Sequence, residues 1–205
     1  MTPHVHDAMT ELASGAELTP WSEKPELLFS RPGGEYRANG ALAGDVPSPS
    51  PRAGTPLPWH VDVPRLPKVG IVDVQMFTFL DTVEPGGGGP AVVAGSHRLL
   101  NDGAALSIKD VNQELAREPF FRDLLARDSA ECDGLFETTG RVQGVDLEVL
   151  ELVGEPGDVY LMNLQVLHAK CPNNRPAPRL MMTQRFLLES VRGQVRNRYY
   201  QPPSY

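Results

Sequence analysis

His60 and Asp62 stand two residues apart in the stretch "TPLPWHVDVPRLP", residues 55–67. Alternate residues of an extended strand point to the same face, so the pair could offer an imidazole and a carboxylate to one metal ion. Two polar residues on a solvated strand have the same spacing, and a short motif of this kind is weak evidence by itself. The metal interpretation therefore needs a third ligand elsewhere in the chain.

The second half of the sequence offers that ligand. His168 ends a strand-like stretch, and Arg179 begins another eleven residues later (179 − 168). If a β-barrel brings these strands beside His60 and Asp62, the site holds two imidazoles and one carboxylate. This is the facial triad that suits non-haem Fe(II), because it leaves one face of the octahedron open for substrate and oxygen.

The elements around these residues are mainly short strands. "VGIVDVQMFTFLD", residues 69–81, has the β-branched and aromatic composition of a buried strand, with Asp73, Gln75 and Phe77 on one face. "VEPGGGGP", residues 83–90, must be a turn, because four consecutive glycines lose too much backbone entropy inside a regular element. This turn lacks the Lys-Ser/Thr ending and the following helix of a phosphate-binding loop.

A helical insertion interrupts the strands. From Ser107 the hydrophobic spacing becomes helical, Ser107 and Asp110 form a capping box, and Pro119 begins a second short helix. We expect helices near 107–128, within an insertion at 101–140. The Pro-, Ser- and Gly-rich segment 44–58 is expected to be a long loop that acts as a lid.

Composition sets limits on the class of protein. A chain of 205 residues fits one domain, and 20 prolines and 19 glycines favour turns and short strands. A net charge of −7 argues against a nucleic-acid partner, and no apolar run is long enough to span a bilayer. Two distant cysteines and the lack of a secretory signal favour the cytoplasm. The oligomeric state is not predicted.

Taken together, the motifs resemble one family of enzymes. The order "WHVD", then "FTFLDTVEPGGGGPAVVAGSHR", then "GEPGDVYLMNLQVLHAKCPNNRPAPRLMMTQRF" is similar to that of the phytanoyl-CoA dioxygenase family of Fe(II)/2-oxoglutarate-dependent oxygenases, over residues 55–188. The resemblance implies a mainly β fold, a double-stranded β-helix (jelly-roll or cupin-like) with a few flanking helices. Residues 1–205 would then be a single domain, with 1–54 peripheral and 55–188 forming the core.

The resemblance also implies roles for individual residues. His60, Asp62 and His168 match the catalytic iron ligands, and Arg179 matches the basic residue that binds the distal carboxylate of 2-oxoglutarate. A guanidinium suits this task because its planar fork binds a carboxylate with two hydrogen bonds. The remaining positions expected to contact the cosubstrate are Thr183, which shares a strand face with Arg179, together with Gln75 and Phe77.

The implied activity is a dioxygenase that uses Fe(II), 2-oxoglutarate and O2. It would hydroxylate a small-molecule metabolite, of the kind found in secondary metabolism, by hydrogen abstraction with release of succinate and CO2. The carboxylate of Asp62 disfavours halogenation, because related halogenases carry a small residue there. Desaturation, ring formation and epimerisation stay open, as do a non-catalytic cupin-like binding barrel and a metal-dependent isomerase or lyase.

The chain also departs from the family pattern. Only 59 residues precede His60, the position of Phe77 is more often a tryptophan, and 106 residues separate Asp62 from His168. Arg175 and Arg185 compete for the role of Arg179, and we prefer Arg179 because of its placement at the start of a strand. His97, in "AGSHR", is expected to fix the end of its strand or the following loop through hydrogen bonds and not to bind metal.

Overall fold

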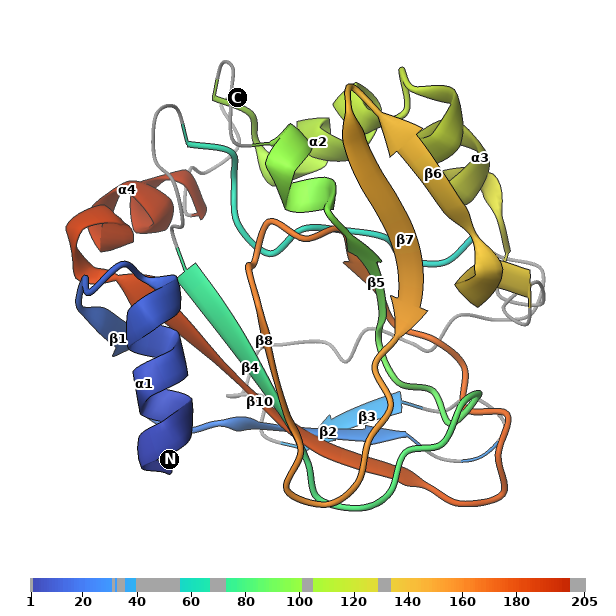
Figure 1. Ribbon diagram of the computed structural model, residues 1–205, viewed down its shortest axis with the longest axis horizontal. Coiled ribbons are helices and arrows are strands. Elements are labelled where there is room, and N and C mark those ends of the chain that lie inside the picture. Colours follow the sequence, from blue (N-terminus) through green and yellow to red (C-terminus); the bar gives the residue numbers. More distant parts are fainter. Residues whose placement is uncertain are drawn as a thin grey trace, which may run out of the picture.

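Two antiparallel β-sheets form the body of the protein, and each is flanked by helices (Figure 1). The structure is a computed structural model that describes residues 2–30, 32, 36–39, 56–66, 73–100, 105–128 and 134–199. The predicted lid at 44–58 lies outside this range except for residues 56–58, and parts of the predicted insertion at 101–140 also lie outside it.

The larger sheet has six strands, in the order β3-β2-β10-β4-β8, with β1 pairing β10. Its longest strand, β10, lies between β2 and β4 and places Thr183 opposite Phe77 and Arg185 opposite Gln75. The strands are β1 (Leu18–Pro20), β2 (Glu26–Ser30), β3 (Tyr36–Asn39), β4 (Asp73–Phe79), β8 (Val159–Met162) and β10 (Arg179–Leu188).

The smaller sheet has four strands, in the order β6-β7-β5-β9. Val92 pairs with His168 on one side and with Leu150 on the other, so all three side chains lie on the same face of the sheet. The strands are β5 (Ala91–Ala94), β6 (Thr139–Val142), β7 (Val145–Glu151) and β9 (His168–Ala169).

Two of the helices begin where capping residues predict. The hydroxyl of Ser107 accepts a hydrogen bond from the amide of Asp110, and Pro119 occupies the first turn of α3, so both predicted helix starts are confirmed. In Figure 1, α2 and α3 lie beside the four-stranded sheet, and α1 and α4 beside the six-stranded one. The helices are α1 (Pro3–Leu12), η1 (Ser96–Leu99), α2 (Ile108–Leu115), α3 (Pro119–Ala126) and α4 (Glu189–Tyr199).

Among the described residues, four apolar clusters hold these layers together, and two of them involve the four-stranded sheet. One lies between the sheets, where Val92 and Val166 pack with Phe77, Phe79 and Met181. The other joins the opposite face of the four-stranded sheet to α2 and α3. Alternate residues of β5 thus enter different clusters, as the pleat requires. The fold is the mainly β, jelly-roll double-stranded β-helix expected from the sequence.

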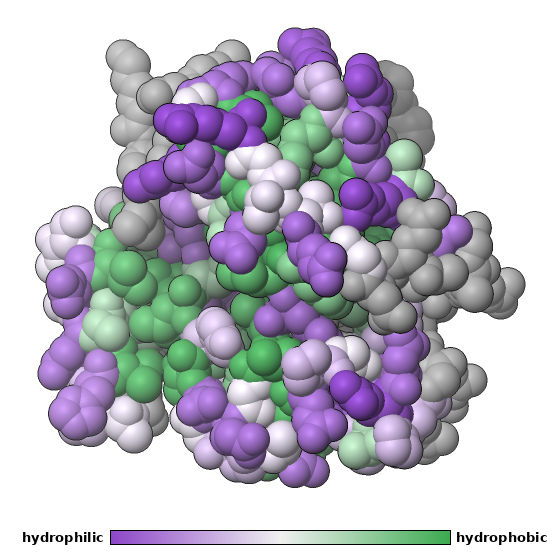
Figure 2. Space-filling view, turned by 45° about the vertical axis from the view of Figure 1, so that its right-hand side comes forward, coloured by the Kyte–Doolittle hydropathy of each residue, from purple (hydrophilic) through white to green (hydrophobic). Residues whose placement is uncertain are grey.

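The surface mixes polar and apolar side chains. In Figure 2 hydrophobic side chains are visible on the left and around the middle of this face, among hydrophilic ones. Large hydrophobic residues of the described chain with more than a third of their area exposed are Leu12, Leu80, Leu150 and Tyr160. Among the described helices, none combines the length and apolar character that a bilayer-spanning segment requires.

Candidate metal centre

His60, Asp62 and His168 come together beside β9 of the four-stranded sheet. Each offers a ligand atom, and these atoms lie within 4.8 Å of one another, so the group could hold a metal ion. The Nε2 atom of His60 lies 3.6 Å from Oδ1 of Asp62, and that of His168 lies 3.7 Å from Oδ2. The two imidazole centroids are 4.3 Å apart.

Backbone pairing brings these distant segments side by side. The amide of His60 donates to the carbonyl of His168, the amide of His168 donates back to His60, and both distances are 2.9 Å. Two residues along, the amide of Asp62 donates to the carbonyl of Leu164 at 3.0 Å. The antiparallel register therefore places both histidines on one face despite the 106 residues between Asp62 and His168.

Both imidazoles are oriented for metal binding by the backbone. Nδ1 of His60 lies 2.8 Å from the carbonyl oxygen of Pro58, and Nδ1 of His168 lies 2.9 Å from that of Val166. A carbonyl only accepts, so each Nδ1 carries the proton and each Nε2 presents a lone pair. Burial lowers the pKa of His168 to about 4, which keeps this imidazole neutral.

Asp62 is held in its charged form by its neighbours. Burial raises the pKa of Asp62, but the charge and hydrogen bond of Arg185, together with the electrostatic effect of the His168 and His60 side chains, outweigh burial, and the net shift is downwards. The Nε of Arg185 donates to Oδ2 of Asp62 at 3.0 Å, and Nη1 of Arg185 lies 3.7 Å from the carboxylate of Glu26. A charged carboxylate is the form that a metal ion requires.

The contact of Arg185 with Asp62 was not predicted from the sequence, where Arg185 was considered only as a competitor of Arg179 for a cosubstrate carboxylate. The signal was present, because Arg179, Thr183 and Arg185 stand at odd positions of one strand and share a face. What could not be foreseen is which segment would lie opposite that face.

The residues predicted to contact the cosubstrate lie on β4 and β10. Nε2 of Gln75 donates to the hydroxyl of Thr183 at 3.0 Å, both side chains are buried, and Phe77 lies buried opposite Thr183. Because the Thr183 hydroxyl accepts this hydrogen bond, its own hydrogen can be donated to another oxygen. Oε1 of Gln75 is buried and makes no hydrogen bond in the described structure.

Arg179 is 3% exposed, and its Nη1 donates to the carbonyl of Gly88. Arg175 is exposed and donates from Nε to the carbonyl of Pro85 at 2.8 Å. Burial lowers the pKa of Lys170, the charges of Arg179 and Arg185 lower it further, and the charges of Asp62 and Glu26 act in the opposite direction. Lys170 stands two residues after His168, so alternation along the strand could have indicated that it faces the same side.

Asp73 is a second buried acid near the triad, on the same face of β4 as Gln75. Its Oδ1 accepts a hydrogen bond from the amide of Leu164 at 2.7 Å, and its Oδ2 has no hydrogen-bond partner in the described structure. Burial raises the pKa of Asp73 to about 7; the Leu164 amide opposes this shift, Asp62 adds to it and Arg185 opposes it. Asp73 thus holds the segment whose carbonyl pairs with Asp62.

This buried acid predicts a pH dependence of stability. A carboxyl whose pKa is raised on folding binds more protons in the folded chain, so stability falls as the pH rises from about 4 to about 7. Between pH 5 and pH 8 the wild-type protein should lose free energy of unfolding as Asp73 ionises. Asp73→Asn should reduce this loss by roughly 2–3 kcal/mol, since a pKa difference of one unit corresponds to about 1.4 kcal/mol. Urea unfolding of the metal-free protein at both pH values measures this effect. Equal pH dependence in the two proteins contradicts it.

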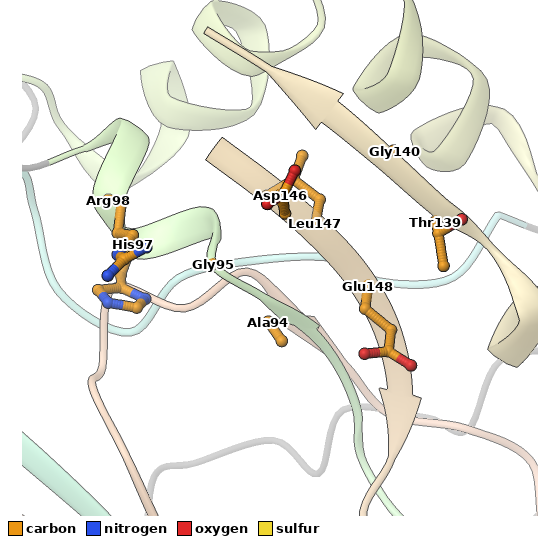
Figure 3. Close-up of a pocket in the computed structure, with 9 residues that line it drawn as sticks. All are labelled: Ala94, Gly95, His97, Arg98, Thr139, Gly140, Asp146, Leu147 and Glu148. Atoms are coloured by element: carbon orange, nitrogen blue, oxygen red, sulfur yellow. The ribbon is translucent and has the colours of Figure 1, made fainter. Parts of the chain in front are cut away.

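A cavity of about 670 Å³ lies on the face of the four-stranded sheet that carries His168. Ala94, Glu148 and Thr139 are paired across three neighbouring strands, so their side chains lie on one face of the sheet. Val92, two residues before Ala94, lies on the same face and pairs with His168. Figure 3 shows His97 and Arg98 of η1 on one side of the cavity and β6 and β7 on the other. The full lining is Ala94, Gly95, His97, Arg98, Thr139, Gly140, Asp146, Leu147 and Glu148.

The Nδ1 atom of His97 is buried and has no hydrogen-bond partner among the described residues, so this nitrogen does not make the predicted hydrogen bond. The neighbouring Ser96 holds the end of the strand, since its hydroxyl accepts from the amide of Leu167 at 2.9 Å. A hydroxyl next to the backbone reaches a nearby amide more directly than a ring does. His97 lies outside the triad, as predicted.

No family model and no curated protein matches the sequence, and the similarities found are to solved structures. AviO1 from Streptomyces viridochromogenes Tue57 matches at 16% identity and a TM-score of 0.53, over 100% of this chain and 61% of AviO1. The non-heme alpha ketoglutarate dependent carbocyclase SnoK from nogalamycin biosynthesis matches at 16% identity and a TM-score of 0.49, over 89% of this chain and 54% of SnoK. EctD from S. alaskensis, with 2-oxoglutarate and 5-hydroxyectoine, matches at 20% identity and a TM-score of 0.38, over 67% of this chain and 40% of EctD. This chain spans about three fifths of the length of AviO1.

Proposed function

We propose that this protein is an Fe(II)- and 2-oxoglutarate-dependent dioxygenase, similar to the phytanoyl-CoA dioxygenase family, that hydroxylates a small-molecule metabolite. The observation that carries the proposal is the meeting of His60, Asp62 and His168 with their ligand atoms within 4.8 Å. Two imidazoles and one carboxylate are the donor set of non-haem Fe(II) oxygenases. A purely structural zinc site would be closed by a fourth protein ligand.

The donor set fits such an ion in its chemistry as well as its position. Both Nε2 lone pairs face the carboxylate, the imidazole of His168 is neutral, and Asp62 is charged. Fe(II) bound here with 2-oxoglutarate and O2 would supply the oxidation that hydroxylates the substrate, with release of succinate and CO2. The task of the chain is to bind and orient the reactants and to exclude water.

Three buried side chains support a role in holding 2-oxoglutarate. Arg179 provides a guanidinium for the distal carboxylate, and the hydroxyl of Thr183 can donate to an oxygen of the same molecule. Gln75 orients Thr183 by its hydrogen bond. Its Oε1 has no hydrogen-bond partner in the described structure and could accept a hydrogen bond from an ordered water when 2-oxoglutarate is bound. Phe77 supplies an apolar wall beside them.

The substrate would enter through the cavity beside Ala94 and Glu148. Its volume of about 670 Å³ is in the range of small-molecule sites. A strand advances about 3.4 Å per residue, so Ala94 lies about 7 Å along the sheet from the row that contains His168. A metabolite seated there could present a C–H bond to the metal centre. No nucleic-acid or membrane partner is proposed, and a cytoplasmic location stays a prediction.

Anaerobic reconstitution tests the proposal without knowledge of the substrate. Purified protein with Fe(II) and 2-oxoglutarate should develop a visible metal-to-ligand charge-transfer band, and the band should be absent when either component is omitted. A protein that binds Fe(II) but shows no band and no succinate formation under O2 would instead be a metal-binding barrel. Product analysis with a metabolite panel then separates hydroxylation from desaturation, ring closure or epimerisation.

A further inference from the structure

The turn Gly86–Gly89 presents its backbone N–H groups to a single carboxylate. Gly86 and Gly88 have φ of +77° and +79°, a region that glycine enters without strain. A Cβ at Gly87 would lie 2.7 Å from the carbonyl of Glu84, and one at Gly89 would collide with the carbonyl of Leu152. The run of glycines is therefore required by the shape of the turn. Successive N–H groups in such turns form anion-binding concavities.

Glu151, the last residue of β7, fills this concavity. Its Oε2 accepts a hydrogen bond from the amide of Gly86 at 2.7 Å, and its Oε1 accepts one from Gly89 at 3.1 Å. Burial raises the pKa of Glu151, and the amides of Gly86, Gly89 and Gly88 together with the charge of Arg179 oppose that shift. The turn resembles a phosphate-binding loop in its N–H groups, but a side chain of the protein itself takes the place of the anion.

The same turn contacts Arg179 through its carbonyl side. Nη1 of Arg179 donates to the carbonyl of Gly88, the residue between the two amides that Glu151 fixes. Gly88 also lies close to Asn173, since a Cβ built on Gly88 would come within 3.0 Å of Asn173 atoms. With its neighbours Gly86 and Gly89 bound to Glu151, the Gly88 carbonyl offers Arg179 an acceptor in a turn that is held from within the fold.

We propose that Glu151 is a positioning residue for Arg179: it closes the glycine turn so that the Gly88 carbonyl aims the guanidinium at the distal carboxylate of 2-oxoglutarate. The inference rests on the proposed function, since it concerns the same cosubstrate. A planar guanidinium binds a carboxylate with two hydrogen bonds only in a narrow range of orientations. The contribution of Glu151 to binding therefore passes through Arg179.

Glu151→Ala leaves the turn amides without their acceptor, and the affinity for 2-oxoglutarate should fall by about tenfold. This is the lower end of the loss of affinity seen when a residue that supports a binding group is replaced. Titration of the charge-transfer band with 2-oxoglutarate under anaerobic conditions measures this affinity. Fe(II) affinity, read without 2-oxoglutarate, should not change, because Glu151 does not contact the triad.

A coupling measurement separates positioning from a general loss of structure. In an Arg179→Ala background, Glu151→Ala should cause no further loss of 2-oxoglutarate affinity, because the group that it positions is absent. Glu151→Gln offers a second variant if the alanine variant does not fold; it keeps one acceptor oxygen and should show a smaller loss.

The matched control is Glu84→Ala, which removes an exposed carboxylate beside the same turn and should leave affinity unchanged. Losses that add in the double variant, or an unchanged affinity in both Glu151 variants, would overturn the proposal. A wild-type protein without any charge-transfer band would refute the proposed function instead, so the two failures are distinguishable.

Discussion

Replacing His168 with alanine should abolish Fe(II) binding and, with it, turnover. The variant loses one of two nitrogen donors and keeps one imidazole and one carboxylate. Its affinity for Fe(II) should fall by more than about 100-fold, since loss of a residue that only supports a metal ligand already lowers metal affinity by about 10- to 100-fold. His168 is nearly buried and carries a backbone pair with His60, so its replacement acts at the centre of the site.

Metal binding itself is the appropriate measurement, because activity would also fall if the fold were damaged. Co(II) titration followed by visible absorption reports occupancy of the triad without oxygen or cosubstrate, and far-UV circular dichroism reports the fold. His6→Ala, an exposed position on α1, is the control and should bind like the wild type. Full Co(II) occupancy in a folded His168→Ala protein would show that the ligand assignment is wrong.

The sequence predicted that His60, Asp62 and His168 would meet, because strand alternation pairs the first two and the resemblance to an enzyme family adds the third, and their ligand atoms do lie close together. Their role as metal ligands stays a prediction. His60 and Asp62 share a face whenever their segment is extended, and the buried strand 73–79 and the strand that begins at Arg179 were recognisable by composition. The capped helices at 107–128 were also local features, determined by Ser107 and Pro119. Local signals of this kind do not depend on the rest of the fold.

Contacts between segments that are distant in the sequence could not be predicted in the same way. Arg185 contacts Asp62 across 123 positions, and Glu151 contacts Gly86 across 65. Entropy predicts that four glycines form a turn, but not that a carboxylate from another strand occupies its N–H groups. Sheet register decides such partners, and a shift of one residue would turn each side chain to the other face.

Replacing Arg179 with alanine should weaken 2-oxoglutarate binding strongly while Fe(II) binding stays intact. Removal of one partner from a buried pair of charges costs about 3–5 kcal/mol, because the remaining charge stays desolvated, and about 3 kcal/mol is more than a 100-fold change in affinity. Arg179 is 3% exposed and its direction is fixed by Gly88, so the distal carboxylate would have no equivalent donor at that place.

The anaerobic charge-transfer titration and the apparent KM for 2-oxoglutarate together measure the Arg179 prediction. Arg179→Lys keeps the charge but lacks the planar fork, so it should fall between the wild type and the alanine variant. Arg117→Ala, an exposed residue paired with Glu114, is the control for loss of one positive charge. An unchanged requirement for 2-oxoglutarate in Arg179→Ala would move the role to Arg175 or Arg185. Arg185 already contacts Asp62, so its replacement should disturb metal binding as well, and this difference identifies which arginine holds the cosubstrate.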